Sequence, residues 1–279
     1  MSRVSVNGVD LYYEERGEGL PILGVHGTPS SAVLWADAAQ ELARHGRCIT
    51  YDRRGFHRSS PPVPFESMDL VEHVDDAAAL LAALHAGPAV VIGRSTGGLI
   101  ALELARRFPD KVQALVLLEP ALFTIDPDAA AWARNLRQRV LELASGQPGL
   151  LAESVIREAA GDAAWEALPA GLREMFAGTS NAVLAEINGH GFDLSDDALE
   201  LSEEDLAGIR RPTLIVSAED SVGAFRAVNA RLSGALPFTH TVQVTGGHVI
   251  NPAHPAVLDF VDRIAGTDRA ASWHQSDGT

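Results

Sequence analysis

The chain has 279 residues, and 46% of them are hydrophobic, which is enough for one large α/β core. Its 37 acidic and 22 basic side chains give a formal net charge of −15, which argues against nucleic acid and anionic membrane surfaces as partners because both repel an acidic protein. Cys48 is the only cysteine, so no internal disulfide forms, and no run approaches the roughly 18 consecutive apolar residues of a membrane span. We therefore expect a cytoplasmic protein, a monomer or a homodimer, that acts on a small-molecule substrate.

The first elements of the chain are predicted to be an antiparallel hairpin followed by alternating strands and helices. Residues 4–6 and 9–15 alternate in polarity around Asn7-Gly8, a dipeptide favoured in tight hairpin turns. Beyond the hairpin we expect strands over 21–25, 48–51, 89–92 and 112–118, and helices over 32–45, 70–85 and the stretch after Ser95. This alternation predicts a mostly parallel sheet with helices on both faces.

The alternation stops between residues 121 and 208, where helical patterns follow one another without an intervening strand. We expect this stretch, called the lid segment below, to be a helical insertion into a core formed by residues 1–120 and 209–265. The core resumes with strands over 212–216 and 241–244 and helices over 223–232 and 256–264, and residues 266–279 are expected to form a polar tail.

An acidic run without basic residues lies at the end of the lid segment. We interpret it as a solvated face and a source of capping carboxylates rather than a metal site. Its members are Asp193, Asp196, Asp197, Glu200, Glu203, Glu204 and Asp205.

The pentapeptide Gly93-Arg-Ser-Thr-Gly97 follows an apolar strand pattern and precedes a helix pattern. A serine on such a strand-to-helix turn exposes its hydroxyl at the sheet edge, with the N–H of the next residue directed at any oxyanion that forms there. Ser95 is therefore the candidate nucleophile, and the N–H of Thr96 is a candidate oxyanion donor. The turn after residues 21–25 is expected to add the N–H of Thr28.

A serine hydroxyl needs a base to take its proton. Among the ten histidines, His248 is the candidate base because it follows the last strand pattern and precedes the last helix, after Gly246 and Gly247. Glu119 ends an almost wholly apolar strand, where a carboxylate is costly unless a cation such as an imidazolium pairs with it.

These residues together resemble the α/β-hydrolase superfamily over nearly the whole chain. The resemblance lies in His26-Gly-x-Pro, Asp52-x-Arg-Gly, Gly93-x-Ser-x-Gly and Gly247-His248, in that order. The turn at His26 also looks like that of haloalkane dehalogenases and epoxide hydrolases, which use an aspartate where this chain has Ser95. The serine implies acyl transfer rather than halide or epoxide chemistry.

The resemblance leaves two positions for the acid of the triad. The Leu-Glu-Pro ending at Glu119 resembles that of zearalenone-lactonase-like hydrolases, whose acid lies on this strand. The later position, where relatives carry aspartate, holds Ser221 here, with Asp220 displaced by one residue. Glu119 is preferred and Asp220 is the alternative.

The resemblance implies an α/β-hydrolase fold and a serine hydrolase that cleaves a carboxylic ester or lactone through an acyl-enzyme, without a cofactor or metal. Trp132 and Trp165 in the lid segment are candidate substrate contacts. Other reactions of the same triad remain alternatives, namely carbon–carbon bond hydrolysis, perhydrolysis and a biosynthetic cyclase or lyase step, as does a ligand-binding homologue without turnover.

Overall fold

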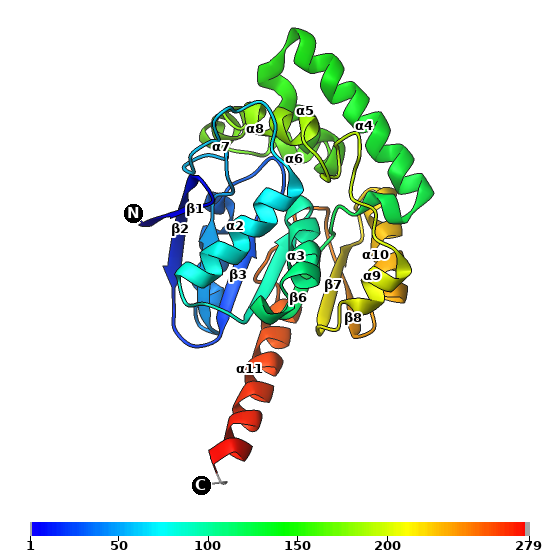
Figure 1. Ribbon diagram of the computed structural model, residues 1–279. Helices are drawn as coiled ribbons and strands as arrows, with labels where there is room; N and C mark the ends of the chain where they lie inside the picture. Colours follow the sequence, from blue (N-terminus) through cyan, green and yellow to red (C-terminus); the bar gives the residue numbers. More distant parts are fainter. Residues whose placement is uncertain (1, 277–279) are drawn as a thin grey trace.

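A sheet of eight strands, counted over the described residues, runs through the centre of the molecule (Figure 1). The structure is a computed structural model that describes the backbone of residues 2–276 and the side chains of residues 2–266. The strand order is β1-β2-β4-β3-β5-β6-β7-β8. The strands are β1 (Ser2–Val6), β2 (Val9–Arg16), β3 (Pro21–Val25), β4 (Arg47–Tyr51), β5 (Ala89–Arg94), β6 (Val112–Leu118), β7 (Thr213–Ala218) and β8 (Thr239–Val244).

The predicted hairpin and parallel sheet are confirmed. Strand β2 pairs antiparallel with both β1 and β4, and the neighbours from β4 to β8 all pair in parallel. The carboxyl ends of the parallel strands therefore meet at one edge of the sheet, where loops after different strands come together.

Two apolar layers lie on opposite faces of the sheet. Successive side chains of a strand point to opposite faces, so Leu115 and Leu117 of β6 enter one layer while Val116 and Leu118 enter the other. The first layer holds α2 (Leu70–Ala83), α3 (Thr96–Arg107) and α10 (Gly223–Ala235), and the second holds α1 (Ala36–Leu42) and α11 (Pro255–Ser276).

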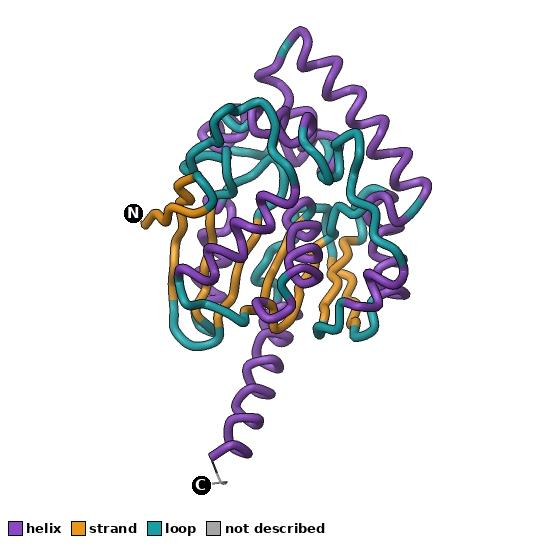
Figure 2. The backbone as a smooth tube through the Cα atoms, viewed as in Figure 1, coloured by secondary structure: helices purple, strands orange, loops and turns teal. Residues whose placement is uncertain are grey.

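Most of the lid segment, up to residue 188, lies over the carboxyl edge of the sheet, where its helices form the upper part of the molecule (Figures 1 and 2). Its last helix lies lower, beside α10 (Figure 1). Its elements are helical apart from loops and an isolated bridge between Gly191 and Ala198. The helices are α4 (Pro127–Gly146), α5 (Leu151–Ala160), α6 (Asp162–Glu166), α7 (Ala170–Ala177), α8 (Ser180–Asn188) and α9 (Glu203–Gly208). The lid segment thus covers the edge at which the parallel strands end.

Two helices differ most in extent from their predictions. The helix predicted over 32–45 begins as a 3-10 turn, Ala32–Trp35, and its α-helical part α1 ends at Leu42. Helix α11 continues to Ser276, well past residue 264, because no proline interrupts the chain there. Most of the predicted polar tail is therefore helical, and its residues 277–279 lie outside the described residues.

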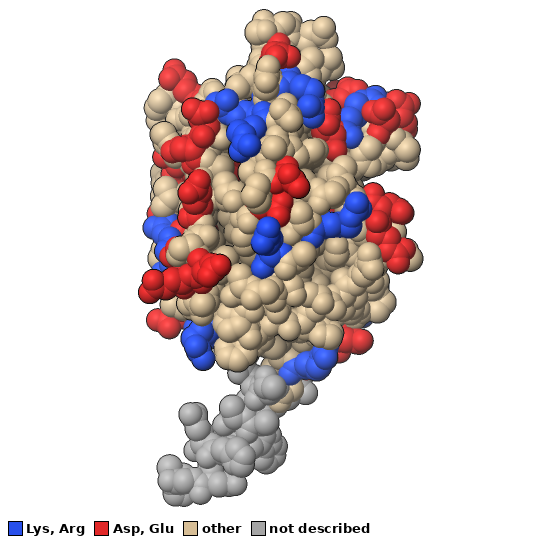
Figure 3. Space-filling model, turned by 90° about the vertical axis from the view of Figure 1, so that its right-hand side faces the viewer, with Lys and Arg blue, Asp and Glu red and all other residues tan. Residues whose placement is uncertain are grey.

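Acidic and basic side chains are interspersed over the face shown in Figure 3, without a continuous basic patch on that face. Among the described residues, no helix combines the length and the apolar character that a membrane crossing requires.

Candidate active site

Ser95 lies on a sharp turn between β5 and α3. Its backbone has φ 55° and ψ −124°, outside the regions that a side-chain-bearing residue prefers. The turn fits because Gly97 packs against β3, where an added Cβ would lie 2.2 Å from the carbonyl oxygen of Val25. The close packing behind the turn leaves Ser95 facing the lid segment, as the pentapeptide predicts.

Two backbone N–H groups are available beside Ser95. The turn that contains Gly27 and Thr28 lies so close to it that a Cβ on Gly27 would be 3.0 Å from the Ser95 Cβ. Among the described residues, the N–H groups of Thr28 and Thr96 have no hydrogen-bond acceptor. The predicted oxyanion donors are therefore both unpaired and near the candidate nucleophile.

His248 and Glu119 form a buried pair. The Nδ1 atom of His248 lies 2.8 Å from Oε2 of Glu119, and the glutamate side chain is fully buried. Glu119 follows β6 directly with a positive φ of 49°, and His248 lies in the loop after β8. A carboxylate at Nδ1 orients the imidazole and leaves Nε2 as the proton-accepting nitrogen.

Two further donors hold the Glu119 carboxylate. The N–H of Ala218 donates to Oε1 at 2.8 Å, and the hydroxyl of Ser221 donates to Oε2 at 2.6 Å. Ser221 occupies the position at which relatives were expected to carry the acid. Asp220, the alternative acid, has an exposed side chain, and within the described part of the chain only its backbone N–H is paired, with the carbonyl of Gly246. The structure therefore brings Glu119 to His248 and leaves Asp220 outside.

The surroundings of His248 favour its neutral form. Burial lowers its pKa from the usual 6.5, the bond to Glu119 opposes this shift, and the charge of Arg94 adds to it. The ring of Phe225 stacks on the imidazole, with centroids 3.8 Å apart. Arg94 has no carboxylate partner among the described residues, and burial lowers its pKa to about 10. A neutral imidazole is the form that can accept a proton from a serine.

A buried cluster that sequence reasoning missed holds the turn of Thr28. Arg53 donates to Thr28 Oγ1 at 2.5 Å and to the carbonyl of Gly27 at 3.1 Å, and it forms an ion pair with Glu186 of α8. Thr28 Oγ1 in turn donates to Glu186 at 2.6 Å. The position of Arg53 just after the parallel strand β4 could have indicated that it lies at the site. Arg53 is passed over in the sequence because Asp52 and Arg54 are the residues that belong to the recognised motif.

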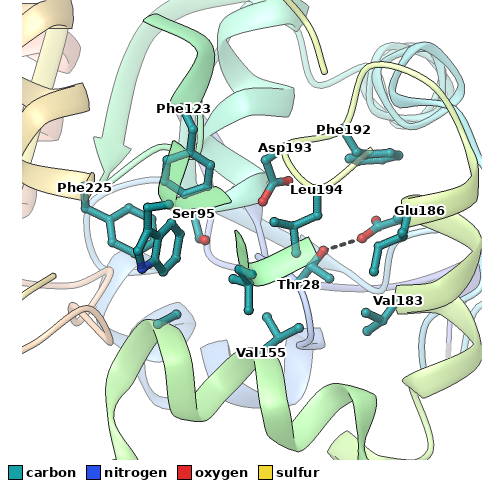
Figure 4. A pocket seen from close by; sticks show the side chains of 14 residues that line it. Thr28, Ser95, Phe123, Val155, Val183, Glu186, Phe192, Asp193, Leu194 and Phe225 are labelled. Atoms are coloured by element: carbon teal, nitrogen blue, oxygen red, sulfur yellow. Dashed lines mark hydrogen bonds between the residues drawn. The ribbon is translucent and has the colours of Figure 1, made fainter. Parts of the chain in front are cut away.

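Among the described residues, Ser95 lines two cavities, which also share Thr28, Val155 and Ala159. The lid-side cavity holds about 430 Å³ of empty space, open mouth included, and is lined by Phe123, Trp132, Glu186, Phe192, Asp193 and Phe225, among others (Figure 4). The histidine-side cavity holds about 650 Å³ on the same measure and is lined by Leu34, Ile156, Leu168, Phe176 and His248, among others.

The two candidate tryptophans are placed differently. Trp132 lines the lid-side cavity, in edge contact with Phe123. Trp165 packs with Phe176 in an apolar cluster inside the lid segment and lines neither cavity. We therefore carry Trp132, and not Trp165, into the proposed site.

The residues of the acidic run differ in their structural roles. Asp205 caps α9 together with Ser202, as interpreted from the sequence. Asp193 differs from the prediction of a solvated or capping role, because its carboxylate accepts from Thr96 Oγ1 at 3.1 Å and lines the lid-side cavity. No group of three metal-ligating side chains occurs among the described residues.

Comparison with known proteins gives the family of the chain. Residues 21–255 match the family model described as "alpha/beta hydrolase fold". An uncharacterized hydrolase, YraK of Bacillus subtilis, is 38% identical over 122 residues. The match covers 44% of this chain and 45% of YraK, so it spans less than half of that protein. The putative carbamate hydrolase RutD of Azorhizobium caulinodans is 28% identical over 90% of this chain and 92% of its own length.

Solved structures agree in fold. The structure of Est816, described as an N-acyl homoserine lactone degrading enzyme, covers 95% of this chain and 99% of its own, with 24% identity and a TM-score of 0.71. The family model covers most of the chain and includes the turn at Ser95, Glu119 and His248. The chain therefore belongs to the alpha/beta hydrolase fold family.

Proposed function

We propose that this protein is a serine hydrolase that cleaves a carboxylic ester or lactone through an acyl-enzyme intermediate. The observation that carries the proposal is the buried contact between His248 and Glu119, in a molecule where His248 and Ser95 line one cavity. A base that is oriented by a carboxylate and lines the same cavity as a strained serine fits the arrangement that serine acyl transfer requires.

In the first half-reaction, the Ser95 oxygen attacks the substrate carbonyl and its proton passes to Nε2 of His248. The carbonyl oxygen becomes an oxyanion, which the N–H groups of Thr28 and Thr96 stabilise. When the tetrahedral intermediate collapses, the bond to the leaving alkoxide breaks, and His248 returns the proton to that oxygen. Glu119 stabilises the transient imidazolium throughout.

In the second half-reaction, water replaces the alcohol. His248 takes a proton from the water, whose oxygen bonds to the acyl carbon, and the ester bond to Ser95 then breaks. The proton returns to Ser95, which leaves a carboxylic acid and the free enzyme. For a lactone substrate, the alcohol and the acid belong to one molecule.

The lining of the histidine-side cavity supports an apolar leaving group. His248 lies in its wall beside aliphatic and aromatic side chains such as Leu34, Leu168 and Phe176. Because His248 delivers the proton to the leaving oxygen, the departing alcohol must lie on this side. We therefore infer that esters of medium-sized hydrophobic alcohols are better substrates than esters of methanol.

Covalent labelling with a fluorophosphonate tests the proposal. The wild-type protein is expected to label at one serine, and S95A is expected to remain unlabelled at equal protein concentration. A parallel hydrolysis screen covers p-nitrophenyl esters, lactones and thioesters, with S95A as the blank. Absence of labelling and of turnover in the folded wild-type protein would show that Ser95 is not activated.

A further inference from the structure

The positions of the two cavities around Ser95 assign them to different parts of a substrate, given the proposed function on which this inference rests. His248 lines the histidine-side cavity and is not among the residues that line the lid-side cavity. The leaving group must reach His248 to be protonated, so it occupies the histidine-side cavity. The acyl group, which stays on Ser95, then extends into the lid-side cavity.

The lid-side cavity is mostly apolar but contains the carboxyl group of Asp193. In Figure 4 this carboxyl group points into the space that Ser95 and Phe123 also face. Its one side-chain hydrogen bond among the described residues comes from Thr96, the residue directly after the nucleophile. Because a carboxyl group can accept several hydrogen bonds, Asp193 can accept a further one from an acyl group held in this cavity.

The two carboxyl groups of this cavity differ in how they are paired. Glu186 is neutralised by the guanidinium of Arg53 and also accepts from Thr28. Asp193 forms no ion pair among the described residues. Burial, followed by the negative charge of Glu186, raises the pKa of Asp193 to about 7, while Thr96 and Arg53 oppose this shift. A carboxyl group without an ion pair in an apolar cavity is stabilised by a ligand that donates a hydrogen bond to it.

We propose that Asp193 is a specificity-determining residue that binds a hydrogen-bond donor on the acyl group, such as a hydroxyl on the first or second carbon after the carbonyl. Asp193 is hydrogen-bonded to Thr96, the residue directly after Ser95, so a donor bound by Asp193 lies near the acyl carbon that Ser95 attacks. An apolar acyl chain would exclude water from the carboxyl group of Asp193 without offering it a further hydrogen-bond donor. The cavity therefore selects acyl groups that are apolar in body and carry a donor close to the ester.

The test compares kcat/KM for three p-nitrophenyl esters, butanoate, 2-hydroxybutanoate and 3-hydroxybutanoate, at pH 8. Hydrogen bonds to charged groups change binding enough to give a preference of about 10- to 100-fold, expected here for at least one hydroxy ester over butanoate. In D193L this ratio is expected to fall to within about twofold of one, because kcat/KM of the hydroxy ester falls by more than that of butanoate.

The control is D196L, on the same loop, because the side chain of Asp196 is 91% exposed and lines neither cavity of Ser95. It is expected to keep the wild-type ratio. Should D193L fail to fold, D193N replaces it, with an expected fall in the ratio of at least about threefold because the amide carries no charge.

Three outcomes separate the possible failures. A wild-type ratio near one, with butanoate hydrolysed and Ser95 labelled, overturns this inference and leaves the proposed function intact. Equal losses for all three esters in D193L also overturn it, since they indicate that Asp193 only anchors the lid segment to Thr96. Absence of both labelling and hydrolysis in the wild-type protein overturns the proposed function and this inference with it.

Discussion

The turn at Ser95 and the lid segment above it are built in different ways. At the turn, backbone packs on backbone, and Gly97 leaves no room for a Cβ beneath Ser95. In the lid segment, side chains define the site, with Trp132 and Asp193 lining a cavity between helices and loops. Under the proposed function, the constrained backbone supports acyl transfer while many lid side chains can vary. We therefore expect the sheet to set the reaction type and the lid segment to contribute most to substrate preference.

The largest expected effect concerns the sheet side of this comparison. E119Q keeps the shape of the side chain but removes the charge that stabilises the imidazolium, so kcat is expected to fall by about 10⁴-fold. D220N serves as the matched variant on the neighbouring loop and is expected to retain wild-type kcat because Asp220 is exposed. Steady-state kinetics on p-nitrophenyl butanoate measure both. A large loss in D220N with little change in E119Q would reverse the assignment of the acid.

Two glycine variants compare the packing of the two regions directly. In G97A the new methyl group would meet the Val25 carbonyl at 2.2 Å, so the free energy of unfolding is expected to fall by about 4 kcal/mol. In G171A, on helix α7 of the lid segment, nothing lies within 4 Å, and a gain of about 0.5 kcal/mol is expected. Urea denaturation measures both values. A similar cost at both positions would contradict the contrast between the two regions.

E186Q tests the contact between the regions. The variant removes the charge that pairs with Arg53, and the turn of Thr28 loses part of its support. We expect kcat to fall by about 10²-fold, the loss that follows when one oxyanion donor is displaced. E174Q, at an exposed position of α7, is the control and is expected to leave kcat unchanged. If E186Q lowers thermal stability but keeps the wild-type kcat, the cluster does not position the turn.

The smallest expected effect is a difference between two pH profiles. Burial lowers the pKa of His248, and the base acts in its neutral form, so kcat/KM for butanoate is expected to reach half its plateau below pH 6.5. For the preferred hydroxy ester, ionisation of Asp193, whose pKa is about 7, is expected to add a further rise of a few-fold through neutral pH. This second rise is expected to be absent in D193N. A second rise that persists in D193N would assign it to another group.

Much of the sheet and its turn could be predicted because local rules determine them. Apolar strand patterns, the Asn7-Gly8 turn and the glycines around Ser95 each restrict the backbone, and the structure has the corresponding elements. The acid of the triad could be narrowed to Glu119 or Asp220 from the sequence. Glu119 is the preferred candidate because a carboxylate at the end of a buried strand requires a partner. That Glu119 rather than Asp220 contacts His248 depends on the folded loop after β7, which turns Asp220 outward and directs Ser221 to Glu119.

The roles of lid side chains could not be predicted in the same way. Asp193 belongs to a run of acidic residues, and sequence alone gives no reason to separate it from its exposed neighbours Asp196 and Asp197. Trp132 and Trp165 look equivalent in sequence, yet one lines a cavity and the other packs inside the lid segment. Which face of a helix meets a cavity depends on how helices distant in sequence pack together, and periodicity does not encode that arrangement.

The bond between Glu186 and Thr28 has a consequence for recombination among related hydrolases. Lids are natural units for making chimeras, because they are continuous in sequence and leave the sheet intact. In this protein, a transplanted lid segment without an acidic residue at the position of Glu186 would leave the guanidinium of Arg53 buried without an ion pair. The turn of Thr28, which Arg53 contacts, would then lose part of its support. Exchange of the lid segment therefore requires a matching change at Arg53, so the lid segment and the loop after β4 have to be exchanged together.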